Sequence, residues 1–422
     1  MIINITGIHY TNYLRKIFMK ELAWLKRINS LDSCVGGSHK LIKISFEEIV
    51  KFAKDSTQLD DFGDNSWISY LNECLKSEAS LNENSTLIRL IFKAQTIMRI
   101  RNRLLLVDHL KRNPEIKNES IDSPVFITGL PRSGTTILFE LLSQDPLFEA
   151  PLGYDTLFEM PSPGQSETQE SFRKGAAECL FELTMDIIPD LKSKHDHRHD
   201  LPVECADIMA NIATIPHPKF DSQGTYEERV GYFKDDVRYK WHKLVLQTLQ
   251  YRSGPKTWLL KDLFHIHFLN LVFKLHPKAR IIHTHRDPIS VIPSLLSLLN
   301  SMGSMYPEYQ VKNTHQVMSL FEGGLRKSIE QRENNPELNK QIADIHFSKL
   351  LTDPIDSIKL IYKKFDINFY PENRDMILKY LKFRPRQKYG GHSYSLSDFG
   401  LSESVVRRQF KFYTDYYHIP TR

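Results

Sequence analysis

The hydrophobic and polar positions of this chain follow two different periods along its length. Over the first 120 residues, apolar side chains recur every three or four positions, which predicts amphipathic helices. Farther on, short apolar runs alternate with helical periods, as expected for parallel strands that are buried on both faces. The pattern therefore predicts a helical N-terminal region, residues 1–120, and an α/β domain, residues 121–422. The helices predicted in the first region are Tyr13–Ile28, Phe46–Phe52, Trp67–Leu75 and Leu87–Leu110.

The most informative stretch runs from Pro124 to Gln144, with the sequence PVFITGLPRSGTTILFELLSQ. It begins with a β-favouring apolar strand, Val125–Ile127, and continues through a loop with a glycine at each end, Gly129–Gly134. A helix is predicted over Thr135–Ser143. Backbone N–H groups converge where such a loop enters a helix, and the helix dipole adds partial positive charge. This stretch therefore predicts an anion-binding site.

Two further candidate strands lead into basic residues. Thr257–Lys261 ends in Lys261, and Arg280–Thr284 is followed closely by Arg286. Doubly wound sheets bind their ligands at the carboxyl ends of the strands, so both cations are expected beside the glycine loop. After the second of these strands, Asp287-Pro288 is expected to begin a helix, with Asp as the N-cap and Pro as the first helical residue. The predicted fold class is α/β, with a central parallel sheet flanked by helices.

Residues 151–250 are predicted to form a mostly helical insertion over the site. Ser171–Ile188 and Arg238–Gln250 have helical periods, whereas Asp145–Gln169 is rich in proline and glycine and is expected to be irregular. Between them, Lys194–Cys205 contains three alternating histidines, which are consistent with a solvated loop, a substrate site or a metal site. We expect no bound metal. The three histidines are His195, His197 and His199.

Composition narrows the class of protein. Of the 422 residues, 41% are hydrophobic and 25% are charged, which is typical of a globular protein. The net charge of +5 is spread along the chain, so we expect no nucleic-acid partner. The four cysteines lie far apart, without the spacing of a zinc site or a disulfide framework. With no signal peptide and no apolar run of transmembrane length, the expected location is the cytoplasm. The sequence does not indicate the oligomeric state.

The glycine loop has the spacing of a nucleotide P-loop, but Thr135 stands where a Walker motif has lysine. The hexapeptide Pro131–Thr136 resembles the 5′-phosphosulfate loop of sulfotransferases that use 3′-phosphoadenosine 5′-phosphosulfate (PAPS). This resemblance implies a P-loop-like sulfotransferase fold and a PAPS donor, with 3′-phosphoadenosine 5′-phosphate as product. The donor-binding residues that it implies are Pro131, Arg132, Ser133, Gly134, Thr135, Thr136, Arg286, Ser294 and Lys388.

Three later motifs extend the resemblance over about residues 121–415. Arg286 and Ser294 match the pair that holds the donor's 3′-phosphate in this family, and a guanidinium suits a phosphate because it donates two parallel hydrogen bonds. The run Trp258–Leu269 is similar to a second motif of the family, although Leu263 replaces its usual proline. Lys388–Leu401 resembles a loop near the 3′-phosphate and the acceptor.

A mechanism follows from the resemblance. Arg132 and Lys261 are the candidates to stabilise negative charge on the leaving oxygen. The candidate bases that take the acceptor's proton are His265, which is preferred, and Glu204. The acceptor is expected to be a hydroxyl or amine of a small molecule, lipid or sugar. His265 could instead be a buried structural histidine.

Two other functions stay open at this stage. One is a P-loop small-molecule kinase, which would need a Walker lysine after Gly134 and an acidic strand end for magnesium. The other is a non-catalytic nucleotide-binding protein on the same fold.

Overall fold

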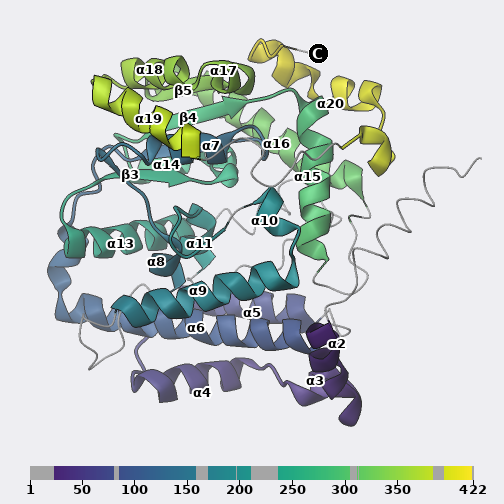
Figure 1. Ribbon diagram of the computed structural model, residues 1–422. Coiled ribbons are helices and arrows are strands. Elements are labelled where there is room, and N and C mark those ends of the chain that lie inside the picture. The colour runs from purple at the N-terminus through teal and green to yellow at the C-terminus, as the bar shows by residue number, and fades with distance from the viewer. Residues whose placement is uncertain are drawn as a thin grey trace, which may run out of the picture.

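The computed structural model describes residues 23–79, 85–157, 170–195, 197–210, 236–304, 311, 313–383 and 394–420 (Figure 1). Most of the helix predicted over Tyr13–Ile28 lies outside these residues, and so does Lys388. In the part of the chain that is described, no helix is long and apolar enough to cross a membrane.

A five-stranded parallel sheet forms the centre of the fold, in the order β2-β3-β1-β4-β5. All five residues of β1 are buried, which explains why its sequence is continuously apolar. Its first residue, Val125, is opposite Leu259 on one side and Arg280 on the other. This sheet confirms the predicted fold class. The strands are β1 Val125–Gly129, β2 Phe148–Glu149, β3 Thr257–Lys261, β4 Arg280–His285 and β5 Ile342–His346.

Helices cover both faces of the sheet (Figure 1). The face that carries Val125 and Ile127 packs against α7 Thr135–Leu142, α18 Pro354–Lys364 and α19 Pro371–Phe383. The helices whose residues join Phe126 of the opposite face in one core are α4 Phe46–Thr57, α5 Ser66–Ala79, α6 Thr86–Arg112, α11 Cys205–Ala210, α13 Asp236–Ser253 and α14 Leu269–Leu275. The helices that pack together in a third core are α15 Pro288–Gly303, α16 Thr314–Asn334 and α20 Glu403–Tyr416.

The other helices in the described residues are short, apart from α9, which has 18 residues. The α-helices are α2 Ala23–Asn29, α3 Ser38–Leu41, α8 Gly153–Leu157, α9 Glu170–Ile187, α10 Leu191–Lys194 and α17 Phe347–Thr352. The 3₁₀ helices are η1 Ser30–Cys34, η2 Pro114–Asn118, η4 Leu263–His267, η5 Pro336–Gln341 and η6 Leu396–Phe399.

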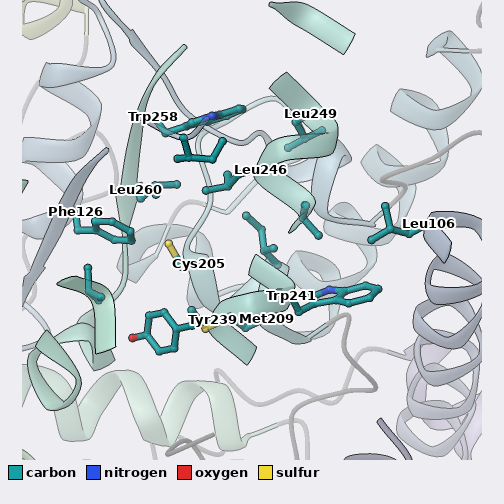
Figure 2. Close-up of a cluster of buried hydrophobic side chains, with 14 of the residues drawn as sticks. Leu106, Phe126, Cys205, Met209, Tyr239, Trp241, Leu246, Leu249, Trp258 and Leu260 are labelled. Carbon is teal, nitrogen blue, oxygen red and sulfur yellow. The ribbon is translucent and has the colours of Figure 1, made fainter. Parts of the chain in front are cut away.

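The N-terminal helices share a hydrophobic core with the sheet. Figure 2 shows Phe126 and Leu260 of the sheet facing Leu246 and Leu249 of α13, with Leu106 of α6 beyond them. All five side chains are at least nine-tenths buried. Burying each such side chain contributes about 1.5–3 kcal/mol relative to exposure. Residues of α4, α5 and α6 therefore stabilise the layer that supports β1 and β3.

Local sequence explains where the site elements begin. Asp287 is the N-cap of α15, its side chain accepts a hydrogen bond from the N–H of Ile289, and Pro288 is the first helical residue, as predicted. Asp262 is likewise an N-cap and begins the short 3₁₀ helix η4. The segment that was expected to be irregular after Asp145 contains the edge strand β2 and helix α8 in its described part.

Candidate active site

The glycine loop between β1 and α7 is shaped by close backbone contacts. Gly129 has φ 146°, and a Cβ atom there would lie 2.5 Å from the carbonyl oxygen of Thr284. Gly134 has φ 97°, and its Cβ would lie 2.5 Å from a ring carbon of Phe347. Neither position accepts a side chain without displacement of its neighbours. Gly134 is also the N-cap of α7 and offers no side-chain acceptor, so the helix N-terminus favours an anion.

Ser133 fixes the loop from inside. Its side chain is fully buried, and its Oγ donates to the carbonyl of Leu130 at 2.5 Å. The same oxygen lies 2.6 Å from Oγ1 of Thr284, on the neighbouring strand β4. These contacts join two residues within the loop and tie the loop to β4. Because its hydroxyl is engaged on both sides, Ser133 orients the loop in this structure.

The structure brings Arg132, Arg286 and Ser294 together. Nε of Arg132 donates to Oγ of Ser294 at 3.1 Å, and its NH1 donates to the carbonyl of Lys194 at 2.7 Å. NH1 of Arg286 donates to the backbone carbonyl of Arg132 at 2.7 Å, and its guanidinium lies 4.3 Å from the ring centre of Phe347. Arg132 therefore contacts Ser294 through its side chain and Arg286 through its backbone carbonyl, between the glycine loop and α15.

Lys261, at the end of β3, connects the N-terminus of α7 to a carboxylate. Its Nζ lies 2.7 Å from Oε1 of Glu204 and 3.2 Å from Oγ1 of Thr136. Lys261 is only 4% exposed, so its charge acts in a largely desolvated environment. Although burial alone would raise the pKa of the Glu204 carboxyl, the neighbouring Lys261 ammonium holds that pKa below its ordinary value.

Asp262 holds Glu204 next to Lys261. One of its oxygens accepts from the N–H of Ala206 at 2.7 Å, at the beginning of α11, and the other accepts from the N–H of Phe264 at 2.8 Å. These bonds fix the start of α11 against the end of β3. Burial, with the nearby charge of Glu204, raises the pKa of Asp262 to about 7.

Two of the alternating histidines face carboxylates of this region. Nε2 of His195 lies 4.0 Å from Glu204, and burial lowers the pKa of His195 to about 4, so its ring is neutral near pH 7. Nε2 of His197 lies 3.3 Å from Oδ2 of Asp207. Burial opposes the charged ring, but Asp207 outweighs it and raises the pKa of His197. Both histidines therefore belong to the polar wall around Glu204.

His265 occupies a different environment. It is 1% exposed, its Nδ1 lies 2.8 Å from the hydroxyl of Tyr239, and its ring meets Phe126 edge-on at 4.9 Å. Figure 2 shows Tyr239 and Phe126 in the core beside β1 and β3. Burial lowers the pKa of His265 to about 3. Within the described residues its Nε2 has no hydrogen-bond partner.

The structure thus places the predicted site residues in two groups, with His265 apart from both. Arg132 of the loop contacts Arg286 and Ser294, while Lys261 and Glu204 form a contact pair that reaches the first turn of α7 through Thr136. His265 lies in the core.

Lys194 was not among the predicted site residues, and its Nζ lies 3.1 Å from Ser297 and 2.5 Å from Ser301 on α15. Asp207, the partner of His197, was also missed. Both contacts depend on how the chain packs in three dimensions, so spacing along the sequence could not reveal them. The only hint was the alternation of polar residues that begins at Lys194.

A parallel sheet with a glycine-bounded loop after its central strand and cations at the neighbouring strand ends defines an α/β protein of P-loop-like fold. Residues 124–372 match the model of the sulfotransferase family, which is more than half of the chain. The chain therefore belongs to the sulfotransferase family.

Individual relatives agree with this assignment. The chain is 25% identical over 284 residues to the omega-hydroxy-beta-dihydromenaquinone-9 sulfotransferase Stf3 of Mycobacterium bovis and of Mycobacterium tuberculosis. The match covers 65% of this chain and 70% of the relative. Among solved structures, sulfotransferase STF9 from Mycobacterium avium has a TM-score of 0.76 at 22% identity, covering 90% of this chain and 98% of the other. STF1 from Mycobacterium tuberculosis has a TM-score of 0.69 at 22% identity, with coverages of 87% and 99%.

Proposed function

We propose that this sulfotransferase uses PAPS as its donor and transfers the sulfuryl group to a hydroxyl of an apolar, lipid-like acceptor. The observation that carries the proposal is the position of Lys261, whose ammonium bonds both Thr136 of the anion loop and the Glu204 carboxylate. One desolvated cation thus adjoins a donor site and a potential base. Sulfuryl transfer to a hydroxyl requires both groups, because negative charge develops on the leaving group and the hydroxyl loses its proton.

Residues at the sheet edge fit a donor with two separate anionic ends. Gly129 and Gly134 let the loop pack closely against Thr284 and Phe347, and the N-terminus of α7 that follows the loop favours the 5′ group. Arg286 and Ser294, linked through Arg132, are assigned to the 3′-phosphate. PAPS would supply a sulfuryl group that is already activated, so these residues need only bind and orient it.

We assign the leaving-group role to Lys261 and the grip on the donor's phosphates to Arg132. Lys261 touches the first turn of α7, whereas Arg132 extends away from it to Ser294. A buried ammonium next to the developing negative charge stabilises it more than the same charge in water would. Both cations were candidates for the leaving oxygen from the sequence, and their separation in space supports this division of roles.

We assign the base to Glu204. Its side chain is 21% exposed and contacts Lys261, so an acceptor has access to it next to the donor. His265, the alternative, is 1% exposed, with one ring nitrogen held by Tyr239. A general base has to come within hydrogen-bond reach of the proton that it removes, which favours the carboxylate. His265 is then a structural residue that supports β1 through Phe126.

The lipid-like acceptor is supported by the curated relative, which is named as a sulfotransferase of a hydroxylated menaquinone. An aromatic side chain also borders the polar residues of this region, because the ring of Phe181 meets His197 edge-on at 4.6 Å. We also propose a cytoplasmic location, because Cys34, Cys74, Cys179 and Cys205 are all free thiols.

The kinase alternative has less support. The residue after Gly134 is Thr135 where a kinase of this class has lysine, and β3 ends in Lys261 where magnesium chemistry needs a carboxylate. A non-catalytic binding protein would have no need of the Lys261–Glu204 pair, which is desolvated and therefore costly to maintain.

The test is transfer of label from sulfur-labelled PAPS to hydroxylated quinones, other lipid alcohols, phenols, amines and sugars. The expected result is a labelled lipid alcohol with the wild-type chain and at least a hundredfold slower transfer with Lys261→Ala. Labelled amine or sugar alone would overturn the acceptor assignment. Absence of transfer to every acceptor, with phosphoryl transfer from ATP in its place, would overturn the donor assignment.

A further inference from the structure

The guanidinium of Arg132 is held at two of its three nitrogens by groups outside the glycine loop. Nε donates to Oγ of Ser294 at 3.1 Å, and NH1 donates to the backbone carbonyl of Lys194 at 2.7 Å. The backbone of Arg132 has φ 65°, which is unfavourable for a residue other than glycine and persists only where the surroundings hold it. The two contacts from outside the loop therefore help to determine where this guanidinium points.

The ammonium of Lys194 fixes the carbonyl that receives Arg132. Lys194 is the last residue of α10, a helix of only four residues that lies beside α15 (Figure 1). Its Nζ donates to Oγ of Ser297 at 3.1 Å and to Oγ of Ser301 at 2.5 Å, both on α15. Only 9% of the Lys194 side chain is exposed, so water competes little for these bonds. The side chain thus anchors its own backbone to α15.

Three serines on one face of α15 complete a ring of contacts. Ser294, Ser297 and Ser301 are three and four residues apart, a spacing that places side chains on the same face of a helix. Ser294 accepts from Arg132, and the other two serines accept from Lys194. The bond from Arg132 to the Lys194 carbonyl closes the ring. The position of Arg132 is therefore coupled to the position of α10.

An apolar contact attaches α10 to α15 independently of the ammonium. Leu191, at the start of α10, is 6% exposed and belongs to a small core that includes Ile188 and Leu298 of α15. The same core contains Leu87 and Ile88 of α6. Loss of the Lys194 ammonium is therefore expected to loosen the carbonyl without releasing the helix.

A second role for Lys194 would be direct contact with the donor. Its ammonium bonds Ser297 and Ser301, whereas the serine assigned to the 3′-phosphate, Ser294, bonds Arg132. Direct contact would require the ammonium to leave serines that already hold it. The observed bonds favour an indirect role, in which Lys194 acts through Arg132.

We propose that Lys194 is a positioning residue: its ammonium fixes its own backbone carbonyl on α15, and that carbonyl directs the Arg132 guanidinium to the donor. The inference rests on the proposed donor site, in which Arg132 grips the phosphates. It adds that α10, which is distant in sequence from the glycine loop, determines how well that loop binds the nucleotide. Lys194 itself touches no part of the substrate in this scheme.

Two changes release the anchor from opposite sides. Lys194→Met removes the ammonium and keeps most of the length of the side chain. The double variant Ser297→Ala/Ser301→Ala removes both acceptors and keeps the ammonium. Lys192→Met is the matched control, because Lys192 lies on the same short helix, is exposed, and has no ion pair or side-chain hydrogen bond within the described residues.

Calorimetry measures the affinity of the full chain and each variant for 3′-phosphoadenosine 5′-phosphate. Lys194→Met and the serine double variant are each expected to weaken binding about three- to tenfold, the loss of one ordinary hydrogen bond, and Lys192→Met to stay within about twofold. Calorimetry fits the stoichiometry separately from the affinity, so a partly unfolded variant still gives a valid result. In steady state, Lys194→Met should raise the donor KM without lowering kcat.

Arg132→Ala supplies the comparison that separates positioning from direct contact. If Lys194 acts through Arg132, adding Lys194→Met to Arg132→Ala should change the affinity by less than about twofold. The positioning role would be overturned by an unchanged affinity in Lys194→Met, by the same loss in both backgrounds, or by a serine double variant that binds as tightly as wild type. If Arg132→Ala itself bound as tightly as wild type, the proposed donor role of Arg132 would fail first, and the inference with it. That single variant distinguishes the two failures.

Discussion

Replacement of Glu204 by glutamine tests the assignment of the base. Glutamine keeps the size of the side chain and its hydrogen-bonding atoms, but it cannot take a proton from an acceptor. It also removes the charge that faces Lys261 at 2.7 Å. The bond from Lys261 to Thr136 remains possible, so the cation has a partner on α7 after the substitution.

The size of the effect follows from the strength of the base. General bases contribute about 10²–10⁴-fold to turnover. Because the Lys261 ammonium holds the pKa of Glu204 low, the carboxylate is a weak base, and we expect the lower part of that range. Glu204→Gln should therefore lower kcat about 10²–10³-fold, an increase of about 3–4 kcal/mol in the barrier.

The assay is single-turnover transfer from saturating PAPS, which measures chemistry without product release. His265→Gln is the matched control, because it removes the other candidate base from a position beside Tyr239. We expect it to lower the rate less than about tenfold and to lower the melting temperature, since the Tyr239 hydroxyl loses its partner. The opposite pattern, with a large loss in His265→Gln and a small loss in Glu204→Gln, would refute the reasoning.

Three further predictions concern the cations and their partners. Arg286→Ala should weaken binding of 3′-phosphoadenosine 5′-phosphate about 10–100-fold, because a charged hydrogen bond is lost, and should leave the affinity for adenosine 5′-phosphate nearly unchanged. Equal losses of affinity for both nucleotides, measured by calorimetry, would contradict the 3′ assignment. Arg132→Ala should raise the donor KM more than it lowers kcat, whereas Lys261→Ala should lower kcat more than it raises the donor KM. If steady-state kinetics gave both variants the same pattern, the assignment of separate roles to the two residues would be wrong. The pKa of Asp344, which accepts two hydrogen bonds from Arg332, is lowered in the folded protein, so its contribution to stability is complete above about pH 4 and declines as the pH falls further. The melting temperature of Asp344→Asn should thus lie furthest below that of wild type near neutral pH, and a gap that widened in acid would have the wrong sign.

Strands and helix starts whose signal lies in adjacent residues of the sequence were predicted correctly. The strands β1, β3 and β4 follow from short apolar runs, and the start of α15 follows from its Asp-Pro pair. The edge strand β2 has only two residues, Phe148 and Glu149, whose pairing with Thr257 and Trp258 is decided by tertiary packing. Two residues have no period to detect, so this strand could not be predicted.

The positions of the candidate site residues were predictable at the strand ends and were not predictable where the chain turns. Lys261 and Arg286 follow directly from the ends of β3 and β4. His265 is only four residues beyond Lys261, but the 3₁₀ turn of η4 points it into the core against Phe126. The contact of Glu204 with Lys261 depends on the N–H of Ala206 that Asp262 binds. Neither the turn nor that bond has a periodic signature in the sequence.

The central claim is that this chain binds the two anionic ends of one nucleotide at neighbouring strand ends, and a crystal structure with 3′-phosphoadenosine 5′-phosphate tests it most directly. The account predicts the 5′-phosphate at the N-terminus of α7, within hydrogen-bond distance of the N–H groups that follow Gly134. It predicts the 3′-phosphate between the side chains of Arg286 and Ser294. A nucleotide bound elsewhere, or one whose 3′-phosphate points to solvent while ATP and magnesium fill the loop, would contradict it.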